Sequence, residues 1–177
     1  MIKKWAGHNN MLEIITDCCS KTYLDMMKHA AMSSNSWNMK YPINLEPKHL
    51  KLDIIENEPL ELMLAGMAMG LLIQIYDKGG KDFFLPELSY CAISMKDRYR
   101  TDNPHIDHEN DKDYIKILGL LNSDWGPDDG GLFMHGNEAI PMVPTYFVVF
   151  DPRVTHCASE ILTDKKRLGL DFTVKKK

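Results

Sequence analysis

The sequence has no strong excess of charge of either sign. Its 177 residues include 21 lysines and arginines against 25 aspartates and glutamates, which gives a formal net charge of −4. A protein that holds a nucleic-acid backbone through long-range electrostatics usually carries a marked positive charge. We therefore expect no nucleic-acid partner for this chain.

Cysteine is scarce, and its positions are irregular. Two of the four cysteines are adjacent, Cys18 and Cys19, unlike the cysteine framework of small secreted domains. We therefore expect reduced thiols and a cytoplasmic location. The segment Met1 to Asn10 has two lysines but no apolar core and no small-residue cleavage site, so it does not resemble a signal peptide.

Long apolar runs are also missing. The longest one, Leu62 to Ile73, is shorter than the roughly 20 residues that a membrane-spanning helix needs, so we expect no membrane association. No internal repeat is visible. The length and the hydrophobic fraction of 44% are typical of a globular protein with a continuous core, and we expect residues 1–177 to form a single domain.

Residues 1–80 are expected to form a helical support for the rest of the chain. A first helix is predicted from about Met11 to His29, because Asn10 and Glu13 have the spacing of a capping box. Apolar residues then recur every three or four positions, which indicates one buried stripe. Residues 32–40 are predicted to form a loop, and the alternation from His49 to Ile55 predicts a strand.

A second helix is predicted between Pro59 and Gly79, since proline favours the first helical position and glycine ends helices. Leu62 to Ile73 is apolar throughout, which predicts a helix buried on nearly all sides. Gly66 and Gly70, one turn apart, would let this helix approach a sheet closely.

Residues 81–177 have the pattern of a β structure, with short strands separated by Pro, Gly and Asp turns. Such a series predicts a sandwich or jelly roll that carries the functional site. The predicted strands are Leu88 to Met95, Tyr114 to Leu121, Leu132 to His135, Ala139 to Val143, Tyr146 to Phe150, His156 to Ile161 and Arg167 to Val174.

Two histidines and one aspartate in this part have the spacing of a metal site. His105 and Asp107 are two residues apart, so in an extended strand both side chains point to one face. A second imidazole would come from a distant strand, and His156 is the candidate. Two histidines and one carboxylate form the facial set that leaves open positions on non-heme Fe(II). Polar pairs at a strand end are also common in turns, so the spacing alone leaves a structural interpretation open.

The residues around these three resemble those of the Fe(II)/2-oxoglutarate-dependent dioxygenases, and most closely the prolyl-hydroxylase branch. In that family, the His-x-Asp motif is followed by a strand ending in Leu-Asn, an aromatic residue, a Gly-Gly pair, and a late histidine with a basic residue beyond it. The matching pieces here, in the same order, are His105-Ile106-Asp107, Ile115 to Asn122, Trp125, Gly130-Gly131, His156 and Arg167.

The resemblance implies a double-stranded β-helix with N-terminal helices packed on one sheet. It also implies that His105, Asp107 and His156 hold Fe(II), with 2-oxoglutarate and O₂ as cosubstrates and ascorbate supporting turnover. The reaction in the family couples decarboxylation of 2-oxoglutarate to succinate and CO₂ with hydroxylation of an unactivated C–H bond.

Arg167 is implied to bind the distal carboxylate of 2-oxoglutarate through two parallel hydrogen bonds. Lys165 and Lys166 are the alternatives for this role. In the family a tyrosine often assists the basic residue, and we expect Tyr90, which lies on a predicted strand, rather than Tyr99.

Three nearby residues have less specific expectations. His108 follows Asp107 directly, so as a strand neighbour it would point away from the metal. His135 either lines the cavity, where it could contact substrate, or is a partly exposed residue at a strand end. Trp125 is expected to pack under the turn from Asp124 to Asp129.

Several functions remain open at this point. The resemblance favours hydroxylation of a peptidyl proline or another protein side chain, while the compact size also allows a small molecule such as a free amino acid. Nucleobase demethylation is disfavoured by the acidic net charge. A jelly-roll module that binds metal without turnover is the non-enzymatic alternative.

Overall fold

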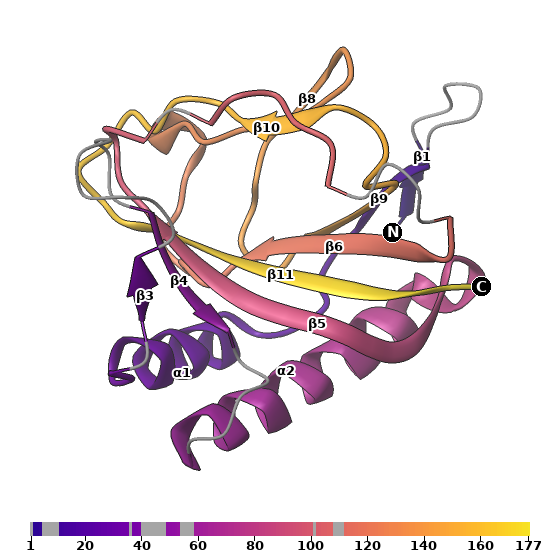
Figure 1. Cartoon of the computed structure of the whole chain (residues 1–177), viewed down its shortest axis with the longest axis horizontal. Coiled ribbons are helices and arrows are strands. Elements are labelled where there is room, and N and C mark those ends of the chain that lie inside the picture. Colours follow the sequence, from indigo (N-terminus) through magenta and orange to yellow (C-terminus); the bar gives the residue numbers. More distant parts are fainter. Residues whose placement is uncertain are drawn as a thin grey trace.

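The computed structural model describes residues 2–4, 11–35, 37–39, 49–53, 59–100, 102–107 and 112–177. Figure 1 shows two β layers that face each other, with both helices on one side. In chain order the elements are β1 (Ile2–Lys4), β2 (Leu12–Ile15), α1 (Lys21–Met32), β3 (Asn38–Met39), β4 (His49–Asp53), α2 (Pro59–Lys78), the 3₁₀ turn η1 (Gly80–Asp82), β5 (Phe84–Lys96), β6 (Tyr114–Leu120), the 3₁₀ turn η2 (Pro127–Asp129), β7 (Phe133–His135), β8 (Glu138–Ile140), β9 (Phe147–Phe150), β10 (His156–Ala158) and β11 (Arg167–Lys176).

Both sheets are antiparallel wherever strands pair. The large sheet has eight strands in the order β1-β2-β9-β6-β11-β5-β4-β3, and the small sheet has three in the order β10-β7-β8. This arrangement confirms the predicted jelly roll, and every strand expected after residue 80 is present. The N-terminal part also supplies strands β1 to β4 to the large sheet, in addition to its helices.

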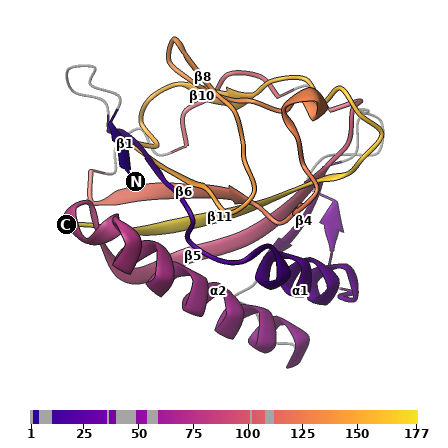
Figure 2. The same ribbon diagram turned by 180° about the vertical axis from the view of Figure 1, so that it is seen from behind.

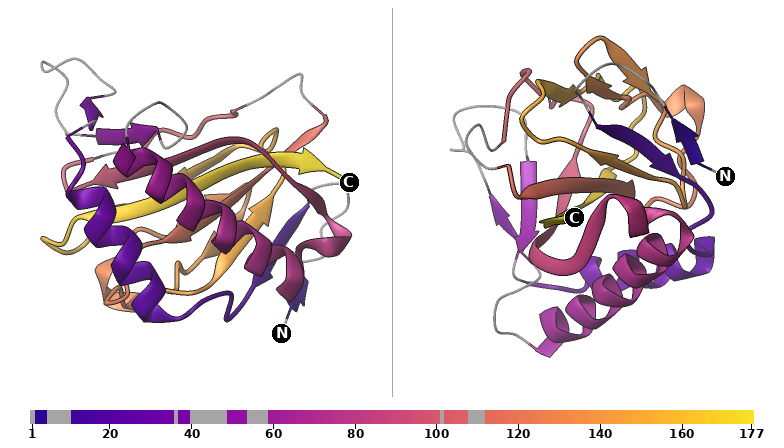
Figure 3. Two further views of the ribbon diagram at one scale, coloured as in Figure 1. Left: turned by 90° about the horizontal axis from the view of Figure 1, so that it is seen from below. Right: turned by 90° about the vertical axis from the view of Figure 1, so that its right-hand side faces the viewer.

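The outer face of the large sheet forms a core with the two helices, which cross that face in Figure 2 and in the left view of Figure 3. Successive side chains of a strand point to opposite faces, so every second residue of β11 faces the helices. Those residues are Leu168, Leu170, Phe172 and Val174, and they share one buried cluster with Leu64, Ala68, Leu71, Leu72 and Ile75 of α2.

A second core lies between the two sheets. Its buried members include Leu120, Trp125, Phe133, Met142, Val148 and Phe150. From Arg167 to Thr173, the residues of β11 that alternate with its helix-facing positions point into the same space, and two of these, Arg167 and Asp171, are charged. The space between the sheets is therefore partly apolar and partly ionic, and the ionic part contains the candidate site.

The prediction of a helix from Met11 to His29 was wrong in its first half. Residues Leu12–Ile15 form β2 and pair with β9, because Leu12 and Ile15 are buried in the sheet rather than along a helical stripe. Helix α1 begins after Ser20, whose side-chain oxygen accepts a hydrogen bond from Tyr23 N at 3.1 Å. Asn10, the expected cap, lies outside the described residues.

Helix α2 matches its predicted bounds but is not buried on all sides. Leu62 is 68% exposed, and Met63 and Ile73 are also exposed. The two glycines do not contact the sheet either. A Cβ at Gly70 would lie 3.2 Å from the hydroxyl of Tyr23 on α1, and one at Gly66 would meet nothing within 4 Å. The helix packs one stripe on the sheet and leaves the other in solvent.

Two further predictions concern short segments. The loop expected over residues 32–40 contains the two-residue strand β3. The strand expected from His49 to Ile55 is present as β4 over His49–Asp53, and residues 54 and 55 lie outside the described residues. Among the described helices, none combines the length and apolar composition needed to cross a bilayer.

Candidate metal site and cosubstrate pocket

Backbone pairing brings the three predicted metal ligands together. The segment that contains His105 and Asp107 runs antiparallel to β10, so that His105 lies opposite His156. His105 N donates to His156 O at 3.0 Å, and His156 N donates to His105 O at 2.9 Å. Asp107 N donates to Pro152 O at 3.1 Å, and this hydrogen bond holds the backbone of Asp107, which lies on the same segment as His105.

The ligand atoms converge with the geometry expected of a metal site. Nε2 of His105 lies 3.5 Å from Asp107 Oδ1, and Nε2 of His156 lies 3.3 Å from Asp107 Oδ2. One ligand atom from each of the three residues can be chosen so that all three atoms lie within 4.8 Å of one another. In the described part of the chain, no other group of histidine, cysteine and acidic side chains has this arrangement.

The protein also holds each imidazole in the tautomer that a metal requires. Nδ1 of His105 lies 2.9 Å from Asn103 O, and Nδ1 of His156 lies 2.8 Å from Val154 O. A carbonyl oxygen only accepts, so both Nδ1 atoms carry the proton and both Nε2 lone pairs face Asp107. This donor set fits a divalent transition metal with open coordination positions.

A buried lysine on β6 completes the ionic surroundings of Asp107. Nζ of Lys116 lies 2.6 Å from Asp107 Oδ2 and 2.7 Å from Asp171 Oδ2. Burial raises the pKa of Asp107, but the charge of Lys116 and its hydrogen bond to the carboxylate act in the opposite direction, and the pKa lies well below its ordinary value. Burial lowers the pKa of Lys116, whereas Asp171 and Asp107 raise it by more. Asp107 is therefore held ionised before a metal arrives.

Sequence reasoning missed Lys116, although a signal was present. Lys116 lies on a strand between Ile115 and Ile117, which pack on the helix side. The alternation of β6 therefore points Lys116 into the space between the sheets, towards the side that carries Leu120. A lysine at such a position requires a carboxylate partner.

Arg167 begins β11 and is almost fully buried between the sheets. Gly131 makes room for it: its φ is +64°, and a Cβ there would lie 3.1 Å from Cδ of Arg167. Among the described residues, Nε of Arg167 has no hydrogen-bond partner. Burial lowers the pKa of Arg167, and the nearby Asp102 acts in the opposite direction. A buried guanidinium with an unpaired N–H group is suited to bind an anion.

The two alternative lysines point elsewhere. Nζ of Lys165 lies 2.9 Å from Asp129 Oδ2 and 2.8 Å from the backbone oxygen of Asp124. Lys166 is mostly exposed, and its Nζ lies 3.1 Å from Asp97 Oδ2. Both ammonium groups are engaged at the surface, which leaves Arg167 as the buried candidate.

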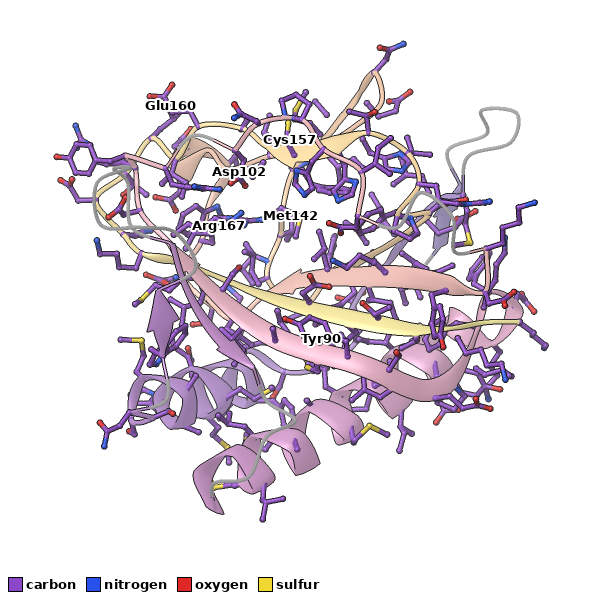
Figure 4. The ribbon with its side chains drawn as sticks, viewed as in Figure 1. Tyr90, Asp102, Met142, Cys157, Glu160 and Arg167 are labelled. Atoms are coloured by element: carbon purple, nitrogen blue, oxygen red, sulfur yellow. The ribbon has the colours of Figure 1, made fainter. Side chains whose placement is uncertain are left out.

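Tyr90 does not lie near Arg167, contrary to prediction. Arg167 pairs with Lys96 at one end of β5, whereas Tyr90 pairs with Thr173 six residues away, about 20 Å at the usual rise of a strand. Figure 4 shows Tyr90 on the large sheet well apart from Arg167. Tyr99 is exposed at the surface. The register of β5 against β11 excludes Tyr90 from the role that the resemblance implied.

His135, Trp125 and His108 have different outcomes. His135 is opposite His156 on β7 and is buried; among described atoms, its Nε2 has no hydrogen-bond partner, and burial lowers its pKa. It is therefore not a partly exposed residue at a strand end. Trp125 is buried, and its Nε1 donates to Gly130 O at 3.1 Å beside the turn where it was expected. His108 lies outside the described residues.

Replacing Lys116 with methionine is expected to act on folding and on metal binding in opposite directions. Two carboxylates would lose their shared cation, at a cost of about 2–3 kcal/mol in the free energy of unfolding, because Asp107 and Asp171 remain 23% and 25% exposed. The undiminished charge of Asp107 should strengthen binding of Ni(II) several-fold. Denaturant unfolding of the metal-free protein and calorimetric titration with Ni(II) measure the two effects.

The matched control is Lys175→Met, which removes a half-exposed ammonium 3.5 Å from Glu87. Such a surface pair contributes about 0–1 kcal/mol, so this variant should behave like the unaltered protein. Equal stability and equal Ni(II) affinity in the two variants would contradict the role assigned to Lys116.

Comparison with known proteins supports the fold. No family model matches the chain, and no curated protein matches it by sequence. Among solved structures, a 2OG-Fe(II) oxygenase family oxidoreductase from Burkholderia pseudomallei aligns with a TM-score of 0.69 and 12% identity, over 94% of this chain and 85% of that one.

Two further neighbours are named for different reactions. A prolyl hydroxylase from Trichoplax adhaerens, solved with a fragment of the hypoxia inducible factor, aligns with a TM-score of 0.64 and 16% identity, over 93% and 83% of the two chains. The alpha-ketoglutarate-dependent carbocyclase SnoK of nogalamycin biosynthesis aligns with a TM-score of 0.65 and 13% identity, over 93% and 79%. The chain thus has the jelly-roll fold found in prolyl hydroxylases and other 2-oxoglutarate/Fe(II) oxygenases.

Proposed function

We propose that the chain is an Fe(II)- and 2-oxoglutarate-dependent dioxygenase that hydroxylates an unactivated C–H bond. One observation carries the proposal: two imidazole Nε2 atoms and one carboxylate converge in the same layer that buries a guanidinium with an unpaired N–H group. The two imidazoles and the carboxylate suit Fe(II), and the guanidinium of Arg167 suits the distal carboxylate of 2-oxoglutarate. Neither feature is needed for a jelly roll to fold.

Each residue has a separate task in this proposal. His105, Asp107 and His156 would hold the metal, and a set of only three protein ligands would leave room for the 2-oxo acid group of the cosubstrate and for O₂. Arg167 orients the cosubstrate through its distal carboxylate, and the surrounding buried side chains exclude water. When bound, iron supplies the oxidative chemistry that yields succinate, CO₂ and the hydroxylated product. Ascorbate supports turnover by keeping iron reduced.

The preferred prime substrate is a protein side chain, such as a peptidyl proline. The solved prolyl hydroxylase with a bound peptide is a neighbour of this chain. In addition, His105 is half exposed and Ile106 is exposed, so one side of the metal site is accessible to a large partner. No nucleic-acid substrate is proposed, because the net charge is −4. The cytoplasm is the proposed location.

The second candidate is a small-molecule substrate such as a free amino acid. The carbocyclase among the structural neighbours acts in the biosynthesis of a small molecule, which shows that the fold serves such reactions as well. Screening peptides and metabolites for substrate-stimulated succinate release separates the two candidates.

Turnover tests the proposal against a module that binds metal without catalysis. Protein mixed with Fe(II), ascorbate, 2-oxoglutarate and O₂ should release succinate, and Asp107→Ala and His156→Ala should abolish the release. Binding of metal without succinate formation, over a broad screen of prime substrates, would favour the non-enzymatic alternative.

Arg167→Ala is expected to raise the KM for 2-oxoglutarate by about tenfold to several hundredfold, because a charge-assisted hydrogen bond contributes roughly 1.5–3 kcal/mol. Arg167→Lys should recover only part of the loss, since an ammonium lacks the planar fork. Metal affinity should be nearly unchanged. Lys165→Ala and Lys166→Ala are the matched controls; a larger loss in either would remove Arg167 from the pocket.

A further inference from the structure

Two cations lie directly opposite each other at the end of the large sheet. Lys96 of β5 and Arg167 of β11 are register partners, so their side chains emerge on the same face. The side chain of Lys96 is 14% exposed, and Arg167 is 6% exposed. Like charges at directly opposed positions are destabilising, and burial increases the cost. The fold must therefore compensate these two charges with an anion.

Asp102 provides the compensating charge. Its carboxylate is 6% exposed; Oδ2 accepts a hydrogen bond from Nζ of Lys96, and Oδ1 accepts one from Nε of Arg100 at 2.9 Å. Burial raises the pKa of Asp102, but Lys96 and Arg100 lower it by more, so the carboxylate stays ionised. Figure 4 shows Asp102 near Arg167 in the space between the sheets.

The compensation is incomplete. The carboxylate of Asp102 is hydrogen-bonded to Lys96 and Arg100 and lies near enough to Arg167 to affect its pKa, but Nε of Arg167 has no hydrogen-bond partner among the described atoms. Burial lowers the pKa of Lys96, and Arg167 adds to this effect against the opposing Asp102. A ligand carboxylate that binds between the sheets beside Arg167 would pair with its guanidinium. Because Lys96 is the register partner of Arg167, the same carboxylate would also reach the ammonium of Lys96.

We propose that Lys96 and Arg167 bind the distal carboxylate of 2-oxoglutarate together, and that Asp102 is a resident carboxylate that competes for Lys96. This inference rests on the proposed function, which already includes Arg167, and it adds roles in cosubstrate binding for Lys96 and Asp102. Asp102 stabilises the ligand-free protein by pairing with Lys96, and it weakens binding of the cosubstrate, because 2-oxoglutarate must share or replace that contact.

Calorimetric titration of 2-oxoglutarate into the Ni(II)-loaded protein measures both roles without turnover. Lys96→Met should raise the Kd for 2-oxoglutarate about tenfold or more, and Lys96→Arg, which keeps the charge, should restore most of the affinity. Asp102→Asn should lower the Kd several-fold. It should also lower the Tm of the ligand-free protein, because the two opposed cations lose their carboxylate. Asp102→Ser gives the same test if the amide variant does not fold.

The matched controls come from an exposed ion pair nearby. Arg98 Nη1 lies 2.8 Å from Asp164 Oδ1, with side chains 47% and 87% exposed. Arg98→Met and Asp164→Asn should leave the Kd unchanged. If the unaltered protein binds 2-oxoglutarate and Arg167→Ala weakens it, while Lys96→Met and the Asp102 variants do not change the Kd, the inference is overturned and the proposed function stands. No binding of 2-oxoglutarate to the unaltered protein would overturn both.

Discussion

Among the described side chains, three largely buried cations lie on the inner face of the large sheet, and each needs a negative partner within the space between the sheets. Lys116 is paired with Asp107 and Asp171, and Lys96 is paired with Asp102. For Arg167, by contrast, Nε has no hydrogen-bond partner among the described residues. Isolated buried charges are costly, so these cations require carboxylates beside them. Asp171 comes from the sheet itself, whereas Asp102 and Asp107 come from the segment 102–107, which also contains His105.

Side chains along β6 and β11 alternate between the two faces of the large sheet, so that apolar core residues and charged residues of the candidate site lie on opposite faces. Their helix-facing residues are apolar and form a core with α2, whereas their inward residues include Lys116, Asp171 and Arg167. Each strand therefore contributes to a core on one side and to a charged site on the other. Substitutions on the outer side should act mainly on stability, and substitutions on the inner side should act on ligand binding and on stability together.

Features that depend on local geometry were predictable from the sequence. The two-residue spacing of His105 and Asp107 placed both on one face, and turn residues marked the strands after residue 80. The segment 11–15 was not predictable in this way, because a short apolar run fits a helix or a strand until a pairing partner such as β9 is known. The distance of Tyr90 from Arg167 and the position of Lys96 opposite Arg167 both depend on the register of β5 against β11, which local patterns do not determine.

The most direct measurement is the thermodynamic coupling between metal and cosubstrate. If 2-oxoglutarate ligates the metal held by His105, Asp107 and His156 while Arg167 holds its far end, Ni(II) should strengthen 2-oxoglutarate binding by more than about tenfold. By linkage, 2-oxoglutarate should strengthen Ni(II) binding by the same factor. Asp107→Ala should abolish this coupling. Binding of 2-oxoglutarate that is equally tight with and without metal would contradict the account, because the two ligands would then occupy independent sites.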